Sequence, residues 1–447
     1  MQLRHVLRFS VALAAEIGFF AALNWFDDWT LETMPVKFVT AAILCGLAYL
    51  FAVSEFAFFA SSRGQALIFW SVALLLRLLA LPLTPGDDLW RYQWEGKIQR
   101  AGFNPYAQAP DAPELTALRA DFPDWTKINR REFRAIYPPG AELFFAAANK
   151  VSDRPLFYKL IFASADVATI GVLLLLIGGP SRYVSAAWYA WNPLVVYSFA
   201  GAAHFDSLLI LLMMAGVLFL VRCASATETR KKWMLALAAS VAFGLAISIN
   251  LIPLLFLLVC VFALGLRAVT LLVSLAIPAL LSLFYGYPNI PIWNSLGSFV
   301  HVARLNDLFW WLIEDTVWPN PHEQNYHYNV IIVISVFVVS LLFFRNWKRG
   351  LLWAMGTALI LSPVLHPWYC TWILPLATWR RAYAWHILSV TLFSYYLFYN
   401  VRLFALPWHA EPWMRAIIVV PPLLALIFRS LRNPELSARA QTSAART

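Results

Sequence analysis

Apolar runs of membrane-spanning length recur from one end of this 447-residue chain to the other. A helix that crosses a bilayer needs roughly 20 consecutive apolar residues. Stretches near this length lie at about 8–26, 36–60, 65–84, 157–178, 183–200, 204–221, 268–286, 329–345, 384–402 and 413–430. Only 13% of the residues are charged, whereas soluble domains average about a quarter. The sequence therefore predicts an all-α polytopic membrane protein.

Two further apolar stretches, 233–265 and 350–379, are long for one span and short for two. Basic residues concentrate in the cytoplasmic loops of membrane proteins, and both stretches begin and end at basic clusters. Each stretch must therefore turn round on the far side of the membrane, near Asn250 in the first and near 363–367 in the second. The result is about 12–14 transmembrane helices with both termini cytoplasmic.

This topology predicts a single integral membrane domain over 1–430 and a cytoplasmic, disordered tail over 431–447. Two large loops, 85–156 and 287–328, fall on the non-cytoplasmic side. The unusual polar positions of the chain fall on the same face, in those loops, at the His204 and His366 turns, at Asn250 and at His409.

The net charge of +10 does not indicate a nucleic-acid partner, because the basic residues lie in short clusters between apolar runs, as topology determinants do. The cysteines, Cys45, Cys223, Cys260 and Cys370, lie in or beside apolar segments without metal-site spacing. Motifs for nucleotide-driven transport, zinc proteolysis or serine hydrolysis are absent.

A short interfacial helix is predicted where the first large loop leaves the membrane. Asp88 can begin this helix, and Gly102 can end it just after Ala101. Trp90 and Trp94 lie four residues apart on one face, so the helix would lie in the membrane interface with these rings toward lipid.

The charges of this helix suggest more than a surface element. Arg91 is spaced three residues from Asp88 and four from Glu95, so these charges can pair along one face. Asp87 and Asp88 are like charges near headgroup depth, where a carboxylate can have a raised pKa and act as a base. The alternative is a surface helix with an N-capping aspartate.

Later segments carry the remaining candidates. His204-x-Asp206 stands at a helix start, where a polar residue can be purely structural, although ionisable groups within membrane segments usually have functions. His366 lies at a hairpin tip and can contact a phosphate, or it can belong to an aromatic belt. Loop 287–328, which holds Arg304, can order over a substrate as a lid or be a plain loop.

In chain order these landmarks resemble those of the GT-C superfamily of membrane glycosyltransferases, and more narrowly bacterial polyprenol-phosphate-mannose-dependent mannosyltransferases. The resemblance spans about 85–380. The landmarks are Asp87-Asp88-x-x-Arg91-Tyr92-x-Trp94-Glu95-Gly96, Gly102-Phe103-Asn104-Pro105-Tyr106, Tyr137-Pro138-Pro139-Gly140, Asn192-Pro193, His204-x-Asp206 and His366-Pro367-Trp368-Tyr369.

The resemblance implies an inverting transferase of the bacterial inner membrane with its active site facing the periplasm. It would move a hexose, mannose-like, from a polyprenyl-phosphate donor to a lipid or glycan acceptor. The catalytic base implied is an acidic residue of the first large loop, Asp88 in preference to Asp87. Donor-phosphate or substrate contacts are implied for Arg91, Tyr92, Trp94, Glu95, Asn104, Tyr137, His204, Asp206, Asn250, Arg304, His366, Trp368 and Tyr369.

One departure from the family pattern concerns the donor phosphate. Relatives often carry a lysine where this chain has Asn250, so Arg91 or Arg304 would have to supply the missing positive charge, or the donor differs. A divalent cation such as Mg²⁺ or Mn²⁺ could be held by Asp87, Asp88 and Asp206, although the sequence does not require one.

Two other functions fit a polytopic chain. A transporter or flippase of a lipid-linked saccharide would be expected to have paired broken helices in an inverted repeat; no clear repeat is found, and the large loop 85–156 is asymmetric. A non-catalytic subunit of envelope assembly would not need the paired carboxylates.

Overall fold

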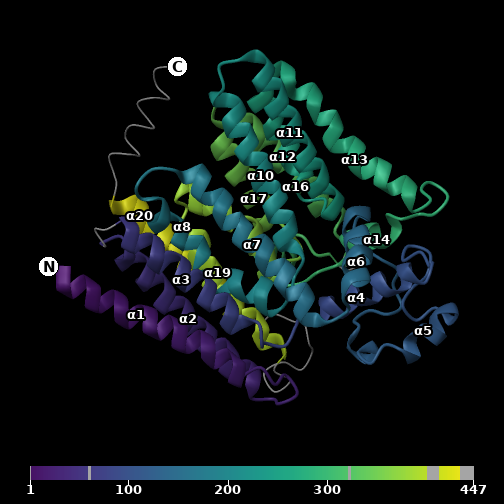
Figure 1. Cartoon of the computed structure of the whole chain (residues 1–447), viewed down its shortest axis with the longest axis horizontal. Helices are drawn as coiled ribbons and strands as arrows, with labels where there is room; N and C mark the ends of the chain where they lie inside the picture. Colours follow the sequence, from purple (N-terminus) through teal and green to yellow (C-terminus); the bar gives the residue numbers. More distant parts are fainter. Residues whose placement is uncertain (1, 59–61, 321–323, 400–411, 433–447) are drawn as a thin grey trace.

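The computed structural model describes residues 2–58, 62–320, 324–399 and 412–432. These residues fold as helices joined by turns, with no β-strand among them (Figure 1), which confirms the all-α prediction. His409 and residues 433–447 of the predicted tail lie outside the described residues.

The helices of the N-terminal half are α1 (Gln2–Ala22), α2 (Met34–Phe56), α3 (Ser62–Ala80), α4 (Asp87–Arg100), α5 (Thr116–Ala120), α6 (Pro139–Val151), α7 (Pro155–Ile177), α8 (Arg182–Ala190), α9 (Pro193–Val196) and α10 (Asp206–Ser225). Those of the C-terminal half are α11 (Thr229–Ile249), α12 (Leu254–Leu264), α13 (Leu271–Phe284), α14 (Asn294–Val302), α15 (Trp310–Thr316), α16 (Tyr326–Leu342), α17 (Trp347–Ile360), α18 (Leu374–Arg380), α19 (Ala384–Thr391) and α20 (Pro412–Arg432).

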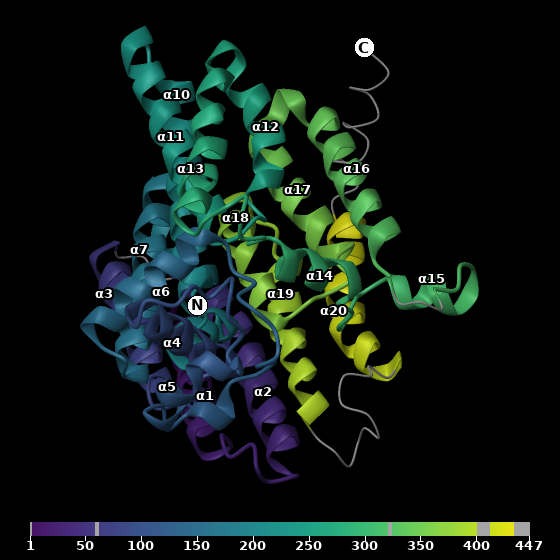
Figure 2. The ribbon, with the colours of Figure 1, turned by 90° about the vertical axis from the view of Figure 1, so that its right-hand side faces the viewer.

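The long helices pack in pairs that follow the chain order, α1 with α2, α10 with α11, and α16 with α17, and α10 also packs on α7. Figure 2 shows the short helices α4, α5 and α6 gathered at one end of this bundle, while α15 projects outward from it. The first large loop is therefore a folded cap on the helices rather than an extended connection.

Six helices of the described part are long and apolar enough to cross a membrane: Arg4–Trp25, Met34–Phe56, Pro155–Ile177, Asp206–Ser225, Thr229–Ile249 and Leu254–Phe284. A bent pair, Tyr326–Leu342 and Phe344–Ile360, joined at 78°, makes a seventh if it counts as one span. The chain is thus an integral membrane protein with fewer full-length spans than the predicted 12–14, because several apolar segments form short or broken helices. The predicted span 183–200, for example, breaks where Asn192 caps α9 through Leu194 N–H.

Both turns deduced from charge are present. Helix α11 ends at Ile249, and Asn250 starts the turn that leads to α12. Helix α17 ends at Ile360, and an irregular segment leads to a 3-10 helix over Pro367–Trp372.

The predicted helix of the first large loop is α4, and Gly102 follows its end with φ +86°. The prediction that its tryptophans face lipid is wrong. Trp90 is 6% exposed and Trp94 is fully buried, and both pack in a small core that includes Phe122 and Ile128. The loop folds back over α4, because burying these large rings within the protein removes more apolar surface from water than leaving them at the interface.

Close helix packing fixes α4 in place. A side chain at Gly96 would put a Cβ 2.5 Å from the Phe145 carbonyl oxygen of α6, so only glycine permits this approach. At the start of α6, Gly140 lies equally close to Ser248 at the end of α11. The first loop is thereby seated on the transmembrane bundle.

Candidate active site

A pocket of ≈ 850 Å³ lies where the folded first loop meets the bundle. Its walls come from the first loop, the start of α10, the α11–α12 turn, α14 with the segment after it, and the turn before the 3-10 helix at Pro367–Trp372. The predicted site residues that line it are Asp87, Asp88, Arg91, Tyr92, Tyr137, Asp206, Asn250, Arg304, His366, Trp368 and Tyr369.

The two carboxylates stand in the first turn of α4. A helix N-terminus stabilises negative charge there, and the Gly86 N–H donates to the Ala202 carbonyl at 2.9 Å, which ties this turn to the start of α10. The site has little room at this junction, because a Cβ on Gly86 would lie 3.3 Å from the Ala202 oxygen.

Asp88 pairs with a buried histidine. Its Oδ2 lies 3.5 Å from His204 Nδ1, and Asn129 Nδ2 donates to Asp88 Oδ1 at 3.3 Å and to Asp87 Oδ2 at 2.9 Å. Burial disfavours the ionised form of Asp88, but the neighbouring His204 outweighs it and holds the pKa of Asp88 below its usual value. Burial and the neighbouring Asp88 charge raise the pKa of Asp87. The two environments therefore make Asp88 the stronger acid of the pair.

Three aromatic rings form a stack behind Asp88. The His204 ring lies 3.9 Å from the Trp368 ring at 17°, and the Trp368 ring lies 4.2 Å from that of His366 at 11°. His366 Nδ1 is 3.0 Å from the Tyr395 hydroxyl. Burial lowers the pKa of His366 to about 4, so this ring is neutral at pH 7 and can offer a phosphate a hydrogen bond but not a charge.

Asp206 and Tyr369 are fixed by the same tryptophan. Trp372 Nε1 donates to Asp206 Oδ1 at 2.7 Å, and the Tyr369 and Trp372 rings stack at 4.2 Å. These contacts bind the start of α10 to the His366 turn, so both line one wall of the pocket.

Arg91 turns away from the carboxylates at the helix start. It makes the predicted pair with Glu95 (Nε to Oε1, 2.6 Å) and donates to the carbonyls of Arg130 at 3.1 Å and Phe133 at 2.6 Å. Its side chain is only 7% exposed. Arg91 therefore holds the loop around 130–133, and each of its three guanidinium nitrogens already donates a hydrogen bond within the protein.

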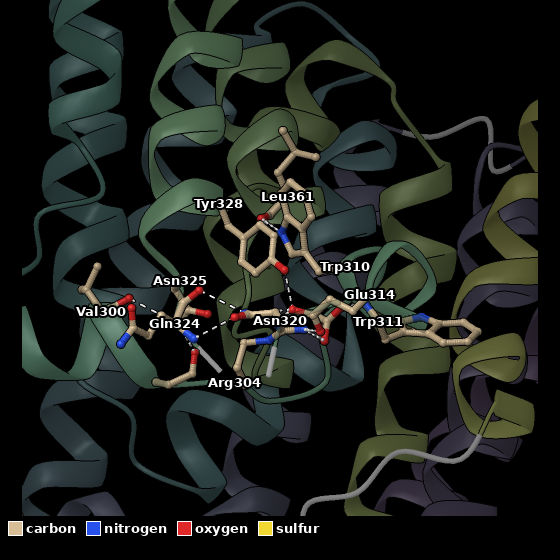
Figure 3. Close-up of polar contacts among 12 residues, drawn as sticks. Val300, Arg304, Trp310, Trp311, Glu314, Asn320, Gln324, Asn325, Tyr328 and Leu361 are labelled. Carbon is tan, nitrogen blue, oxygen red and sulfur yellow. Dashed lines mark hydrogen bonds and ion pairs between the residues drawn. The ribbon is translucent and has the colours of Figure 1, made fainter. Parts of the chain in front are cut away.

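Arg304 is also neutralised, by the network drawn in Figure 3. It donates to Glu314 at 2.5 and 2.9 Å and to Asp307 at 3.2 Å, and the Tyr328 hydroxyl donates to the same Glu314 carboxylate. These acidic partners raise the pKa of Arg304, although burial opposes them. The predicted replacement of the missing lysine by Arg91 or Arg304 is therefore not supported by their partners.

The described part of loop 287–328 contributes a wall of the pocket through residues 295–305. Asn325 Nδ2 donates to the Ala303 carbonyl at 2.6 Å, and Trp310 Nε1 donates to the Leu361 carbonyl at 2.6 Å (Figure 3). Leu305 pairs with Val364 in a short parallel bridge that joins this loop to the His366 turn.

Four predicted site residues do not line the pocket. Trp94 lies in the core of the first loop, and Glu95 is the partner of Arg91. Asn104 donates to the Tyr285 carbonyl at 2.9 Å and shapes a turn. His204 lies behind Asp88, 2% exposed, where it can act on the carboxylate but not touch a substrate directly.

Among the lining residues that the sequence analysis missed are three neighbours in the first loop, Asn129, Arg130 and Arg134. The run Asn129-Arg130-Arg131 and the nearby Arg134 are the available signal, since they form a basic cluster in a loop predicted to be non-cytoplasmic, where the charge rule does not expect one.

A divalent cation at Asp87, Asp88 and Asp206 stays a prediction. Across the described ranges, no group of three His, Cys, Asp or Glu side chains is placed to hold a metal ion by itself. Asp88 faces His204, and Asp206 accepts from Trp372.

Comparison with known families gives one match. The model of the family described as Alpha-(1->6)-mannopyranosyltransferase, N-terminal domain, matches residues 12–266. The carboxylates, the basic cluster, His204, Asp206 and Asn250 lie within the matched range, whereas Arg304 and the His366 turn lie beyond it. Neither a curated protein nor a solved structure matches the chain.

Proposed function

We propose that this chain, which belongs to the alpha-(1->6)-mannopyranosyltransferase family, transfers a mannosyl residue from a polyprenyl-phosphate donor to a hydroxyl group of a lipid or glycan acceptor. The single observation that carries the proposal is the position of the Asp88 carboxylate, which lines the pocket at the end of the bundle and is backed by His204. A glycosyl transfer with inversion needs such a base beside the acceptor hydroxyl.

The reaction balances with groups of this chain. Asp88 takes the proton of the acceptor hydroxyl, whose oxygen forms a bond to C1 of the mannose. The bond from C1 to the phosphate oxygen breaks, and the polyprenyl phosphate leaves with the electron pair. His204 stabilises the Asp88 carboxylate before the step and orients it through the contact at 3.5 Å. Asp88 is preferred to Asp87 because its lowered pKa keeps it ionised.

The walls of the pocket suit an amphiphilic sugar donor. Tyr369 offers an aromatic ring beside which a pyranose can lie, and Leu296, Phe299 and Val302 of α14 add an apolar wall to the same pocket. Val302 is 56% exposed, so this apolar wall continues to the surface, where a polyprenyl chain can leave the pocket for the bilayer.

The replacement Asp88→Asn tests the base. We expect transfer from a polyprenyl-phosphate-mannose donor to fall by about 10²–10⁴-fold, while the protein still inserts and unfolds at the wild-type temperature. Asp124→Asn is the matched control, because Asp124 pairs with Lys127 in the same loop outside the pocket. Wild-type turnover by the Asp88→Asn protein would contradict the proposal.

The orientation is part of the proposal: a bacterial inner membrane, the pocket on the periplasmic side and both termini in the cytoplasm. A His301→Cys protein tests it with a membrane-impermeant thiol reagent, because His301 lies in the loop beside the pocket and the four native cysteines are buried. Labelling is expected from the periplasmic side of spheroplasts. Labelling from the cytoplasmic side alone would overturn the orientation and leave the chemistry untouched.

A further inference from the structure

We propose that Arg130 and Arg134 bind the phosphate of the lipid donor and balance its growing charge as the lipid phosphate leaves, in the role that a metal ion or a lysine would otherwise fill. The inference rests on the proposed function, since it concerns the donor of that reaction.

The first observation is the state of the charges in the pocket. Arg130 and Arg134 line it and are exposed to it. Within the described ranges neither guanidinium has an ion pair or a hydrogen bond, whereas Arg91 and Arg304 are both committed to buried or half-buried carboxylates. The unsatisfied positive charge of the pocket thus lies on this loop.

The second observation is how the loop is held. Arg91 donates to the carbonyls of Arg130 and Phe133, and Asn129 bridges the carboxylates of Asp87 and Asp88. The loop is therefore fixed to the helix that carries the base. The backbone that carries both arginines is thereby held beside the reacting carboxylate.

The third observation is the backbone at Arg130, where φ is +46°. This left-handed conformation is unfavourable for any residue other than glycine and usually persists where the surrounding structure enforces it. Glycine would adopt this conformation at a lower cost in free energy. The presence of an arginine is therefore not explained by the backbone, and its side chain reaches the pocket.

The fourth observation concerns Arg130 and the His366 turn, which line the same pocket. The positive charge of Arg130 adds to burial in lowering the pKa of His366, so the guanidinium lies within electrostatic reach of the His366 turn. A phosphate held between Arg130 and His366 Nε2–H would have a cation on one side and a neutral donor on the other.

The charge count fits a monophosphate donor. A polyprenyl-phosphate sugar is a phosphodiester with one negative charge, and after the C1–O bond breaks the leaving phosphomonoester approaches two. Two guanidinium groups match that final charge, and arginine binds phosphate oxygens through paired hydrogen bonds. Their effect grows as the bond breaks, which is the requirement for lowering the barrier.

The test compares four variants of the full chain in lipid nanodiscs, one of them Arg130→Lys. Arg130→Gly removes the guanidinium and suits the left-handed backbone; Arg134→Gln removes the second charge at an exposed position. The control is Arg131→Gln, because Arg131 packs over the Trp125 ring at 5.4 Å and does not line the pocket. Each protein is assayed for transfer from polyprenyl-phosphate-mannose and for inhibition by polyprenyl phosphate.

We expect kcat/KM to fall by about 10–100-fold in the Arg130→Gly and Arg134→Gln proteins, with kcat falling more than KM rises. Inhibition by polyprenyl phosphate should weaken by a similar factor, Arg130→Lys should recover part of the loss, and a chelator should not change the wild-type rate. Arg131→Gln should match the wild type.

The inference is overturned if both variants keep wild-type kinetics and wild-type inhibition, or if a chelator abolishes transfer while both variants remain active. Binding of polyprenyl phosphate, followed by tryptophan fluorescence, separates this outcome from failure of the proposed function. A wild-type protein that binds this lipid through Arg130 and Arg134 but transfers no mannose refutes only the proposed reaction.

Discussion

Replacement of Arg91 by alanine is expected to destabilise the protein by about 3–5 kcal/mol at pH 7, and by much less at pH 5. Arg91 is 7% exposed and Glu95 is 2% exposed, and their ion pair is 2.6 Å long. Removing the guanidinium leaves a buried carboxylate with no counter-charge at the centre of α4, which is far more costly than losing a surface pair.

The size of this destabilisation follows from the options of the Glu95 carboxylate once Arg91 is removed. It can take up a proton, and for a glutamate with an ordinary pKa of about 4.3 this costs about 3.7 kcal/mol at pH 7 and about 1 kcal/mol at pH 5. The carbonyls of Arg130 and Phe133 also lose a donor, which adds about 1 kcal/mol each where water does not replace it. Protonating this carboxylate costs less free energy at pH 5 than at pH 7. The difference in stability between the wild type and the Arg91→Ala protein should therefore narrow by about 2.7 kcal/mol on acidification.

The assay is the free energy of unfolding in mixed micelles at pH 7 and pH 5, with Arg100→Ala as the control. Arg100 lies on the same helix and donates to the Asn149 carbonyl at 3.0 Å, but it has no carboxylate partner. Its loss should cost about 1 kcal/mol or less at both pH values. A gap for Arg91→Ala that is below about 1 kcal/mol at pH 7, or that does not narrow at pH 5, would refute the reasoning.

Three further predictions follow from buried groups of the site. Burial and the Glu95 carboxylate raise the pKa of Glu142, which favours its neutral form; Glu142→Gln should stay within about 1 kcal/mol of the wild type while Glu142→Ala loses about 1–3 kcal/mol, and the reverse order in unfolding measurements would contradict this. Because the pKa of Asp88 is lowered, its carboxylate stays ionised at least as far down as an ordinary aspartate, to about pH 4. A pH profile of kcat/KM should therefore show no fall caused by protonation of the base between pH 7 and about pH 4.5. A fall in kcat/KM centred near pH 6 would show that another residue is the base. Gly96→Ala should cost about 1–3 kcal/mol in the same unfolding assay, because its Cβ would lie 2.5 Å from the Phe145 carbonyl oxygen, whereas Gly171→Ala, which meets nothing within 4 Å, should be neutral.

The sequence predicts most of the fold that depends on local signals. Apolar length marks the transmembrane segments, and charge at their ends locates the turns after Ile249 and Ile360. Continuous apolar length does not show where a helix breaks inside the membrane, so the predicted number of spans exceeds the number of full-length helices. Asn192, which caps α9 within the bundle, is such a break.

The sequence predicts which residues form much of the site better than it predicts how these residues contact one another. Residues from five separate segments meet in one pocket, because the topology places their loops at the same end of the helices. The partner of each residue follows from tertiary packing, which spacing cannot reveal. Arg91 has the spacing to pair with either Asp88 or Glu95, and it takes Glu95 because the folded loop buries that side of α4.

The two charged clusters of the pocket also limit how a substrate can lie in it. Asp88 and the Arg130–Arg134 pair carry opposite charges and line the same cavity, yet no ion pair joins them in the described structure. The hydrogen bond from Arg91 to the Arg130 carbonyl fixes the loop, and the contact with His204 fixes the Asp88 carboxylate, so each charged group has its own place in the pocket. An inverting transfer needs its base and its leaving phosphate on opposite sides of the sugar carbon, and a pocket that keeps these charges separated leaves the space between them for the pyranose ring. A charge-reversed Asp88→Arg protein should therefore lose turnover yet bind polyprenyl phosphate more tightly than the wild type, because a third guanidinium adds attraction for the phosphate; unchanged donor binding in a fluorescence titration would show that the phosphate lies elsewhere.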